Sequence, residues 1–213
     1  MSSMVLRYTS LSPFSRKVLL LAIERGLMSR LELKATEVGT HVSLATPAHD
    51  DLARCAPLMK IPVLTLENGT SLYDSRVICE YLDTRHSQAS LFPISDDMRW
   101  IALRIQSLAD GIMDASLLCR FESAREESKR SVEWIDAQTR RILQGINFLD
   151  KDVHYMQEPL HIGAISAACA LGYLDFRFAH LNWRIGHDAL AQWFDDFSRR
   201  PSMQRTKPVP IVI

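Results

Sequence analysis

Short apolar runs alternate with amphipathic segments over the first part of the chain. Met4–Tyr8 predicts a strand. A helix is expected to begin at Ser12–Pro13, because serine is a favoured N-cap and proline suits the first helical position. Gly26 predicts the C-terminal end of this helix. Its apolar face would comprise Val18, Leu21 and Ala22.

The following segments predict a second strand and a hairpin. In RLELKATEV, the residues Leu31, Leu33 and Ala35 alternate with polar neighbours, which predicts a half-buried strand. Residues 39–58 read as irregular, with one or two helical turns around Asp50–Cys55. The apolar runs 61–66 and 71–73 flank Asn68–Gly69, which predicts a hairpin with a type I′ turn.

Asp74 and Ser75 predict the start of a further helix by capping. Its apolar side would contain Val77, Ile78, Tyr81 and Leu82. The resulting order, β-α-β followed by β-β-α, is the plan of a thioredoxin-like α/β domain. We expect this domain at residues 1–84.

After a linker at residues 85–95, the apolar residues of every segment recur at the spacing of a helix. Two long helices are predicted, and the segment IGAISAACALGYLDF is apolar nearly all round, which predicts a helix at the centre of a bundle. A last amphipathic helix would end before RRPS. An all-helical domain is therefore expected over residues 96–213, and the fold class is α/β plus all-α, a thioredoxin-like domain followed by a helical bundle.

Charge and cysteine content narrow the classes of function. The chain has 25 Lys+Arg and 25 Asp+Glu residues, so it has no overall electrostatic signature for nucleic acid or an anionic membrane. It shows no secretory signal pattern and no apolar run that could span a bilayer. The four cysteines and seven histidines lack metal-site spacing. We expect a cytoplasmic, metal-free protein with no nucleic-acid or membrane partner.

The segment S-P-F-S, Ser12 to Ser15, has the spacing of a redox C-x-x-C motif but carries hydroxyls instead of thiols. An N-cap role alone would explain Ser12. Alternatively, the helix N-terminus would favour a bound thiolate, to which the hydroxyl could donate. Lowering a thiol pKa from about 8.5 to about 6.5 requires about 2.7 kcal/mol. One hydrogen bond to a charged group, together with the helix end, could supply this.

Two further positions could bind a peptide-like ligand. A cis bond at Ile61–Pro62 would turn the backbone of Ile61 outward for pairing with an extended ligand, whereas Pro62 could instead simply mark an edge strand. Asp74 and Ser75 suit the α-amino and α-carboxylate ends of a ligand, although capping alone also explains them. Lys60 could meet a second carboxylate, or be an ordinary surface lysine.

These segments together resemble the glutathione transferase superfamily over almost the whole chain. YTSLSPFSRKV resembles the family's strand-to-first-helix signature, APLMKIPVL its N-P-x-G-K-[VI]-P-x-L segment, and LYDSRVICEYLD its [DE]-S-x-x-I-x-x-Y-L helix. SAACALGYLDFRF and LADGIMDA resemble second-domain segments of bacterial members. The five motifs stand in family order and indicate a serine-type member similar to the theta, zeta and nu classes.

The resemblance implies a role for each candidate residue. Ser12 would activate the thiol of the co-substrate glutathione, which explains why this helix start needs a hydroxyl and no cysteine. Ile61 would pair with the cysteinyl part of glutathione, and Pro62 would be the family's cis-proline. The γ-glutamyl end would be held by Asp74 and Ser75, and the glycine carboxylate by Lys60. The lack of cysteine near Ser12 disfavours a cysteine-based reductase.

The chain also departs from the family pattern. Ala56–Pro57 replaces the usual Asn-Pro, and Met59 replaces the glycine before the lysine, which puts the loop geometry in question. The second domain's S/T-x-x-D capping box falls at His161, and its loss would cost about 0.5–2 kcal/mol unless another group caps the helix. A contact between glutathione and His41 or His49 stays open.

The expected function is conjugation of the glutathione thiolate to a small apolar electrophile, with a pocket near Leu108, Ile112 and Met113. The family implies a homodimer. Two alternatives stay open: a non-catalytic binding protein similar to the stringent starvation protein, and another glutathione-dependent activity such as an isomerase, dehalogenase or peroxidase. The sequence does not identify the electrophile.

Overall fold

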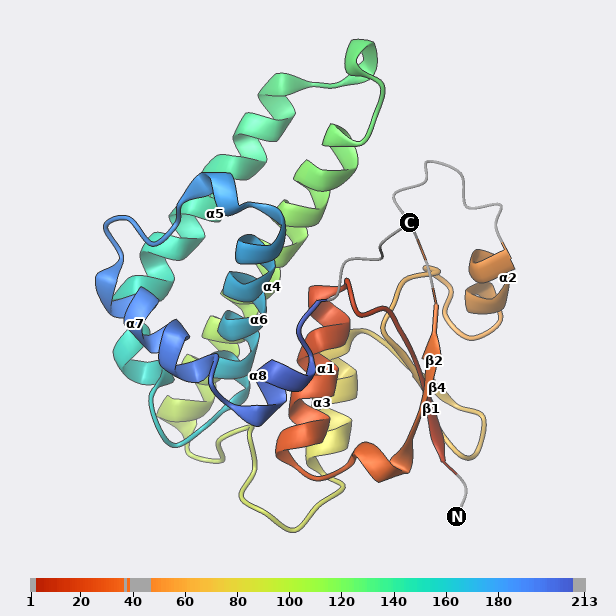
Figure 1. Cartoon of the computed structure of the whole chain (residues 1–213). Helices are drawn as coiled ribbons and strands as arrows, with labels where there is room; N and C mark the ends of the chain where they lie inside the picture. Colours follow the sequence, from red (N-terminus) through yellow and green to blue (C-terminus); the bar gives the residue numbers. More distant parts are fainter. Residues whose placement is uncertain (1–2, 37, 39–46, 209–213) are drawn as a thin grey trace. The chain divides into compact units, whose positions relative to one another are not determined.

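The computed structural model describes residues 3–36, 38 and 47–208, and these form two compact units (Figure 1). One unit contains the chain up to Ser90 together with the chain from Pro201 onward, and the other contains Leu91–Arg200. An α/β thioredoxin-like unit and an all-helical unit confirm the predicted fold class. The expected boundaries, 1–84 and 96–213 with a linker at 85–95, stay predictions.

The first unit is built on a four-stranded sheet of order β2-β1-β3-β4. β1 runs parallel to β2 and antiparallel to β3, and β3 runs antiparallel to β4. Helices α1 and α3 pack together on one side of the sheet, and α2 lies on the other (Figure 1). The elements are β1 (Met4–Tyr8), α1 (Pro13–Glu24), η1 (Met28–Arg30), β2 (Leu31–Ala35), α2 (Pro47–Ala53), β3 (Val63–Thr65), β4 (Ser71–Leu72), α3 (Ser75–Asp83) and α8 (Pro201–Arg205).

Helix α1 forms as its pattern predicts. Val18, Leu21 and Ala22 are fully buried. Arg16 is buried as well, because its guanidinium donates to the Met203 carbonyl oxygen at 3.1 Å and to Thr206 Oγ1 at 3.2 Å. These bonds attach α8 to α1.

Three local predictions were wrong. The amphipathic helix α7 (Asp188–Phe197) ends before RRPS as predicted, but it is not the last helix, because α8 begins at Pro201, a good first helical residue. β2 is an edge strand, so Leu33 is 39% exposed and only Leu31 in β2 is buried. The turn at Asn68–Gly69 is not type I′, which needs positive φ at both central residues.

The hairpin has a three-residue loop instead of the two-residue loop of a type I′ turn. Gly69 has φ +84°, whereas Asn68 does not have a positive φ. The Gly69 N–H donates to the Leu66 carbonyl at 2.9 Å, and the Leu66 N–H donates to the Thr70 carbonyl at 2.7 Å. A turn followed by a left-handed glycine is the usual form of a three-residue hairpin loop, so the hairpin was predicted correctly and only its turn type was not.

The second unit is helical throughout. α6 is buried on all sides from Ile162 to Leu174, which confirms the predicted central helix, and it packs along α4. Among the described residues, no helix has both the length and the apolar character needed to cross a membrane. The elements are α4 (Asp96–Ser123), η2 (Glu127–Lys129), α5 (Val132–Lys151), η3 (Val153–Met156), α6 (Ile162–Arg177), η4 (Ala179–Leu181) and α7 (Asp188–Phe197).

The N-terminus of α6 has a cap, contrary to the expectation for this position. His161 Nδ1 accepts a hydrogen bond from the Ala164 N–H at 3.4 Å, and His161 Nε2 lies 2.7 Å from the Tyr155 carbonyl oxygen. The two contacts together require a neutral imidazole with its proton on Nε2. A histidine therefore replaces the Ser or Thr of the usual box as the capping acceptor.

Candidate functional site

The segments that carry the candidate residues meet at one end of the sheet. β1 ends at Tyr8, and Ser12 follows it at the start of α1. Arg7 in β1 is paired antiparallel with Val63 in β3, so Ile61–Pro62 lies at the end of the sheet from which Ser12 departs.

The last strand brings Asp74 and Ser75 to the same end. Leu72 in β4 is paired antiparallel with Leu64 in β3. The residues that follow β4 therefore run alongside the residues that precede β3. The topology thus brings the start of α1 together with Ile61–Pro62 and Asp74–Ser75, which follow it much later in the sequence. Each of these three segments contributes one of the predicted contacts.

Ser12 is the N-cap of α1. Its Oγ accepts a hydrogen bond from the Ser15 N–H at 3.2 Å, and its backbone is extended. Because the hydroxyl acts as acceptor here, its own proton is still available for donation. Pro13 has no N–H, and the Phe14 N–H makes no hydrogen bond to a described residue, so the positive end of the helix keeps a backbone donor.

Ser15, at the second position of the S-P-F-S segment, differs from Ser12. Its side chain is fully buried, and its hydroxyl has no hydrogen-bond partner among the described residues. Ser12 is only half-buried. The hydroxyl that a ligand can reach is therefore that of Ser12.

The Ile61–Pro62 peptide bond is cis, as the family pattern predicts. Pro62 directly precedes β3, which lies inside the sheet, so the alternative of an edge strand is wrong. Ile61 is half-buried, and its backbone makes no hydrogen bond to the described parts of the chain. Lys60 is exposed beside it.

Met59, which stands where the family pattern has glycine, has a left-handed backbone. Its φ is +50°, in the left-handed region that costs non-glycine residues about 1–2 kcal/mol. The Met59 side chain packs against the small core of Leu52, Ala56 and Val63, which offsets part of this cost. The residue before Lys60 is therefore left-handed although it is not a glycine.

Asp74 is the N-cap of α3, where its Oδ1 accepts from the Arg76 N–H at 2.9 Å. The Asp74 side chain is exposed, so the carboxylate is accessible to a ligand as well. The peptide bond before Asp74 is cis. Ser75 is buried at the first position of α3. Capping and ligand binding are therefore compatible at this helix start.

Helix α2 is fixed to the sheet by charge. Asp51 accepts from Arg7 Nε at 2.8 Å and from Lys34 Nζ at 3.0 Å, and these bonds lower the pKa of Asp51 to about 2. His49 lies on the same helix, where it is buried and interacts with another residue of the protein. His41 lies outside the described residues.

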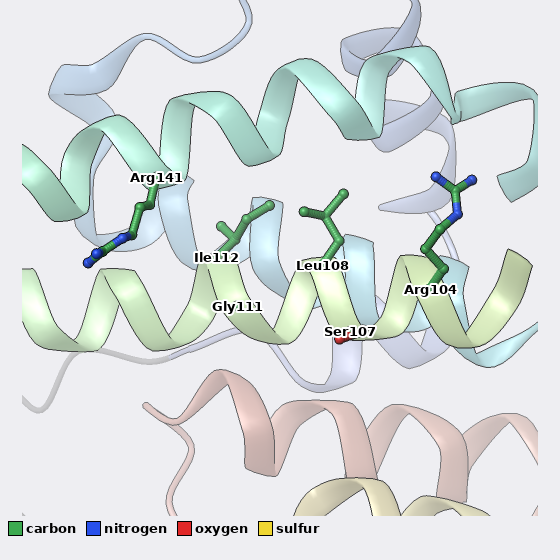
Figure 2. Close-up of a pocket in the computed structure, with 6 residues that line it drawn as sticks. All are labelled: Arg104, Ser107, Leu108, Gly111, Ile112 and Arg141. Carbon is green, nitrogen blue, oxygen red and sulfur yellow. The ribbon is translucent and has the colours of Figure 1, made fainter. Parts of the chain in front are cut away.

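The helical unit has a hollow of about 460 Å³ between α4 and α5. Figure 2 shows Leu108 and Ile112 pointing from α4 toward α5, with Arg104 and Arg141 at the two ends. Leu108 and Ile112, two of the three residues named for the predicted pocket, line this hollow, and the pocket itself stays a prediction. Met113 is fully buried and does not line it. Across the described ranges, no group of three or more His, Cys, Asp or Glu side chains could hold a metal ion.

Comparison with known proteins places this site in a family. The sequence matches "Glutathione S-transferase, N-terminal domain" over residues 11–85 and "Glutathione S-transferase, C-terminal domain" over residues 132–196. It is 31% identical over 201 residues to the "Uncharacterized GST-like protein YibF" of Escherichia coli strain K12, a match that covers 92% of this chain and 95% of the relative. The chain belongs to the glutathione transferase family.

Solved structures of other glutathione transferases agree with this assignment. A family member from Pseudomonas fluorescens Pf-5 with bound glutathione is 42% identical, with a TM-score of 0.91 over 98% of this chain and 100% of that one. A Pf-5 structure with bound S-(propanoic acid)-glutathione is 41% identical, with a TM-score of 0.86 over 97% and 100%. A transferase from Methylobacterium radiotolerans in complex with glutathione sulfonate is 34% identical, with a TM-score of 0.86 over 100% and 98%.

In this member of the family, the sequence indicated the segments that form the site but not several features around them. The left-handed backbone of Met59 had no signal beyond its alignment with a glycine. The partners of Asp51 come from two strands far away in sequence, so no local pattern could have indicated them. The capping role of His161 was missed because histidine is an unusual N-cap.

Proposed function

We propose that this chain binds glutathione at the sheet end of its first unit and transfers the thiolate to a small apolar electrophile. The observation that carries the proposal is the geometry of Ser12. Its Oγ accepts from the Ser15 N–H, and its proton is left to donate to a sulfur at the start of α1. One hydroxyl can therefore cap the helix and stabilise a thiolate at the same time.

The remaining contacts of glutathione are proposed from the same end of the sheet. The backbone of Ile61, beside the cis-proline Pro62, would pair with the cysteinyl part, since it has no hydrogen bond to the described residues. Asp74 and Ser75 would hold the γ-glutamyl end, and Lys60 the glycine carboxylate. The relatives crystallised with glutathione or glutathione sulfonate support this ligand.

A second class of electrophile is favoured by one relative. The Pf-5 structure contains S-(propanoic acid)-glutathione, in which the group on sulfur carries a carboxylate. We therefore include small acidic electrophiles among the candidate substrates of this chain, beside apolar ones. The alternatives of a non-catalytic binding protein and of an isomerase, dehalogenase or peroxidase predict either no conjugation or a different product.

A cytoplasmic homodimer remains part of the proposal. The helical unit exposes large apolar side chains that a second copy could cover, among them Trp100 at 64%, Val132 at 68% and Trp134 at 44% exposure. Light scattering of the purified chain would test the dimer, and a monomer at micromolar concentration would contradict it.

Ser12→Ala tests the mechanism directly. We expect the pKa of bound glutathione to rise by about one to two units, because the variant loses one hydrogen bond to a charged sulfur. The measurement is thiolate absorbance near 240 nm against pH, with the protein saturated by glutathione. Ser12→Thr keeps the hydroxyl and should stay close to the wild-type value.

Ser131→Ala is the matched control. Ser131 caps α5 with the same geometry, since its Oγ accepts from the Trp134 N–H at 3.2 Å, but it lies in the helical unit. Both alanine variants lose a cap worth about 1 kcal/mol, and only Ser12→Ala should change the thiol pKa. If glutathione binds to Ser12→Ala with an unchanged thiol pKa, Ser12 is only a cap. If the wild-type chain does not bind glutathione, the binding proposal itself fails.

A further inference from the structure

A cluster of two arginines and a tyrosine lies within the helical unit, where α4 packs along α6 (Figure 1). Tyr173 and Arg177 are one turn apart on α6, so their side chains share a face of the helix. Arg120 belongs to α4. The charges of Arg120 and Arg177 interact with each other and with the Tyr173 hydroxyl. The three polar groups therefore converge on one place between the two helices.

The polar atoms at this place lack partners. Tyr173 is 2% exposed, and its hydroxyl makes no hydrogen bond within the part of the chain that the structure describes. Arg120 is the charged group of α4 that interacts electrostatically with that hydroxyl. The buried Nε of Arg177 also has no partner among these residues. Buried donors without acceptors are unfavourable, so their presence here indicates an acceptor that the chain itself does not supply.

The charges indicate the nature of that acceptor. Neither Arg120 nor Arg177 forms an ion pair with a carboxylate of the described residues. Asp175 is the acidic residue between Tyr173 and Arg177, and it is already bound by Arg184. Burial and the like charge of Arg120 lower the pKa of Arg177, and burial raises the pKa of Tyr173, so the phenol stays a donor at neutral pH. An anion would relieve the repulsion between the arginines.

We propose that Arg120, Tyr173 and Arg177 form a binding site for a small carboxylate. The two oxygens of a carboxylate can accept about four hydrogen bonds, enough for two guanidinium groups and a phenol. The Arg177 guanidinium lies 4.0 Å from the centre of the Phe176 ring, which orients it before a ligand arrives. All three residues of this site belong to the helical unit.

Propanoate and its uncharged analogue propanamide are suitable probes in calorimetric titration of the full chain. The wild type should bind propanoate and not propanamide. Arg120→Leu and Arg177→Leu should each weaken propanoate binding about tenfold or more, since each removes a charge-assisted hydrogen bond. Tyr173→Phe should weaken binding less, and it should raise the melting temperature of the ligand-free protein because an unpaired buried hydroxyl is removed.

Arg141→Leu is the matched control. Arg141 is an exposed arginine of the same unit and lines the hollow between α4 and α5 (Figure 2). Its substitution should leave propanoate affinity unchanged. Equal binding of propanamide, or an equal loss of affinity in Arg141→Leu and Arg177→Leu, would overturn the proposal. Should either leucine variant at position 120 or 177 fail to fold, the paired change in affinity and melting temperature of Tyr173→Phe still decides it.

The carboxylate can come from a free acid or from an acid carried on a glutathione thioether. S-(2-carboxyethyl)glutathione and glutathione itself separate these sources. If Arg177→Leu weakens the thioether but not glutathione, the site takes the carboxylate of the group on sulfur. If it weakens propanoate alone, the site takes a free acid.

Discussion

Gly163→Ala is expected to lower the free energy of unfolding of the helical unit by about 2–3 kcal/mol. Gly163 lies in the first turn of α6, where an added Cβ would sit 2.7 Å from the Ala102 carbonyl oxygen and 3.0 Å from the His161 ring. The first of these atoms belongs to the backbone of α4, which cannot rotate away as a side chain can. The two helices would have to separate along the contact that buries α6.

Gly111→Ala is the control for this change. Gly111 lies on α4, the helix whose backbone Gly163 approaches. It is exposed, and no atom lies within 4 Å of an added Cβ. Alanine there should raise stability by about 0.5–1 kcal/mol through helix propensity alone. All four tryptophans lie in the helical unit, so their fluorescence during urea unfolding reports this unit. Equal stability of the two variants would contradict the close α4–α6 contact.

His161→Ala is the second large effect we expect, a loss of about 2–4 kcal/mol. Removing an N-cap costs about 1 kcal/mol, and leaving the Tyr155 carbonyl without its donor costs about 1–3 kcal/mol more. His161 is 2% exposed, so solvent cannot easily replace either bond. Urea unfolding followed by tryptophan fluorescence measures the loss.

The same residue makes stability depend on pH. Burial lowers the pKa of His161, and the hydrogen bond to the Tyr155 carbonyl only partly opposes this. The unfolded chain, with an ordinary histidine pKa of about 6.5, therefore binds more protons than the folded chain in mild acid. Stability should be at its full value above pH 6.5 or so, fall as the pH drops below that value, and level off below the folded-state pKa.

His161→Asn separates this effect from other titrations. Asparagine can still cap the helix but does not titrate, so the stability of this variant should vary less with pH between about 5 and 7. His180→Asn removes an exposed histidine that caps no helix and should leave the wild-type pH profile in place. A profile for His161→Asn as steep as that of the wild type would show that other groups cause the pH dependence.

Much of the fold could be predicted from local patterns, because hydrophobic periodicity and helix capping depend on residues that are neighbours in the sequence. The apolar face of α1, the hairpin, the caps at Ser12 and Asp74 and the buried α6 all have such signals. The exposure of Leu33 was not predictable, since whether a strand lies at an edge depends on sheet order. The turn type failed because Asn-Gly also fits a longer loop in which only glycine is left-handed.

For the candidate site as well, features with a local sequence signal could be predicted and features that depend on packing could not. Motif order predicted the cis bond before Pro62 and the helix starts, which the structure confirms. The convergence of Arg120 with Tyr173 and Arg177 could not be predicted, because it depends on how α4 lies against α6. The orphaned hydroxyl of Tyr173 likewise becomes visible only when the packing is known.

The attachment of α8 to α1 affects the order in which the two units can be completed during synthesis. The Met203 carbonyl and the Thr206 hydroxyl, which accept from the Arg16 guanidinium, are synthesised nearly two hundred residues after Arg16. The α/β unit is therefore completed only after every residue of the helical unit has been synthesised.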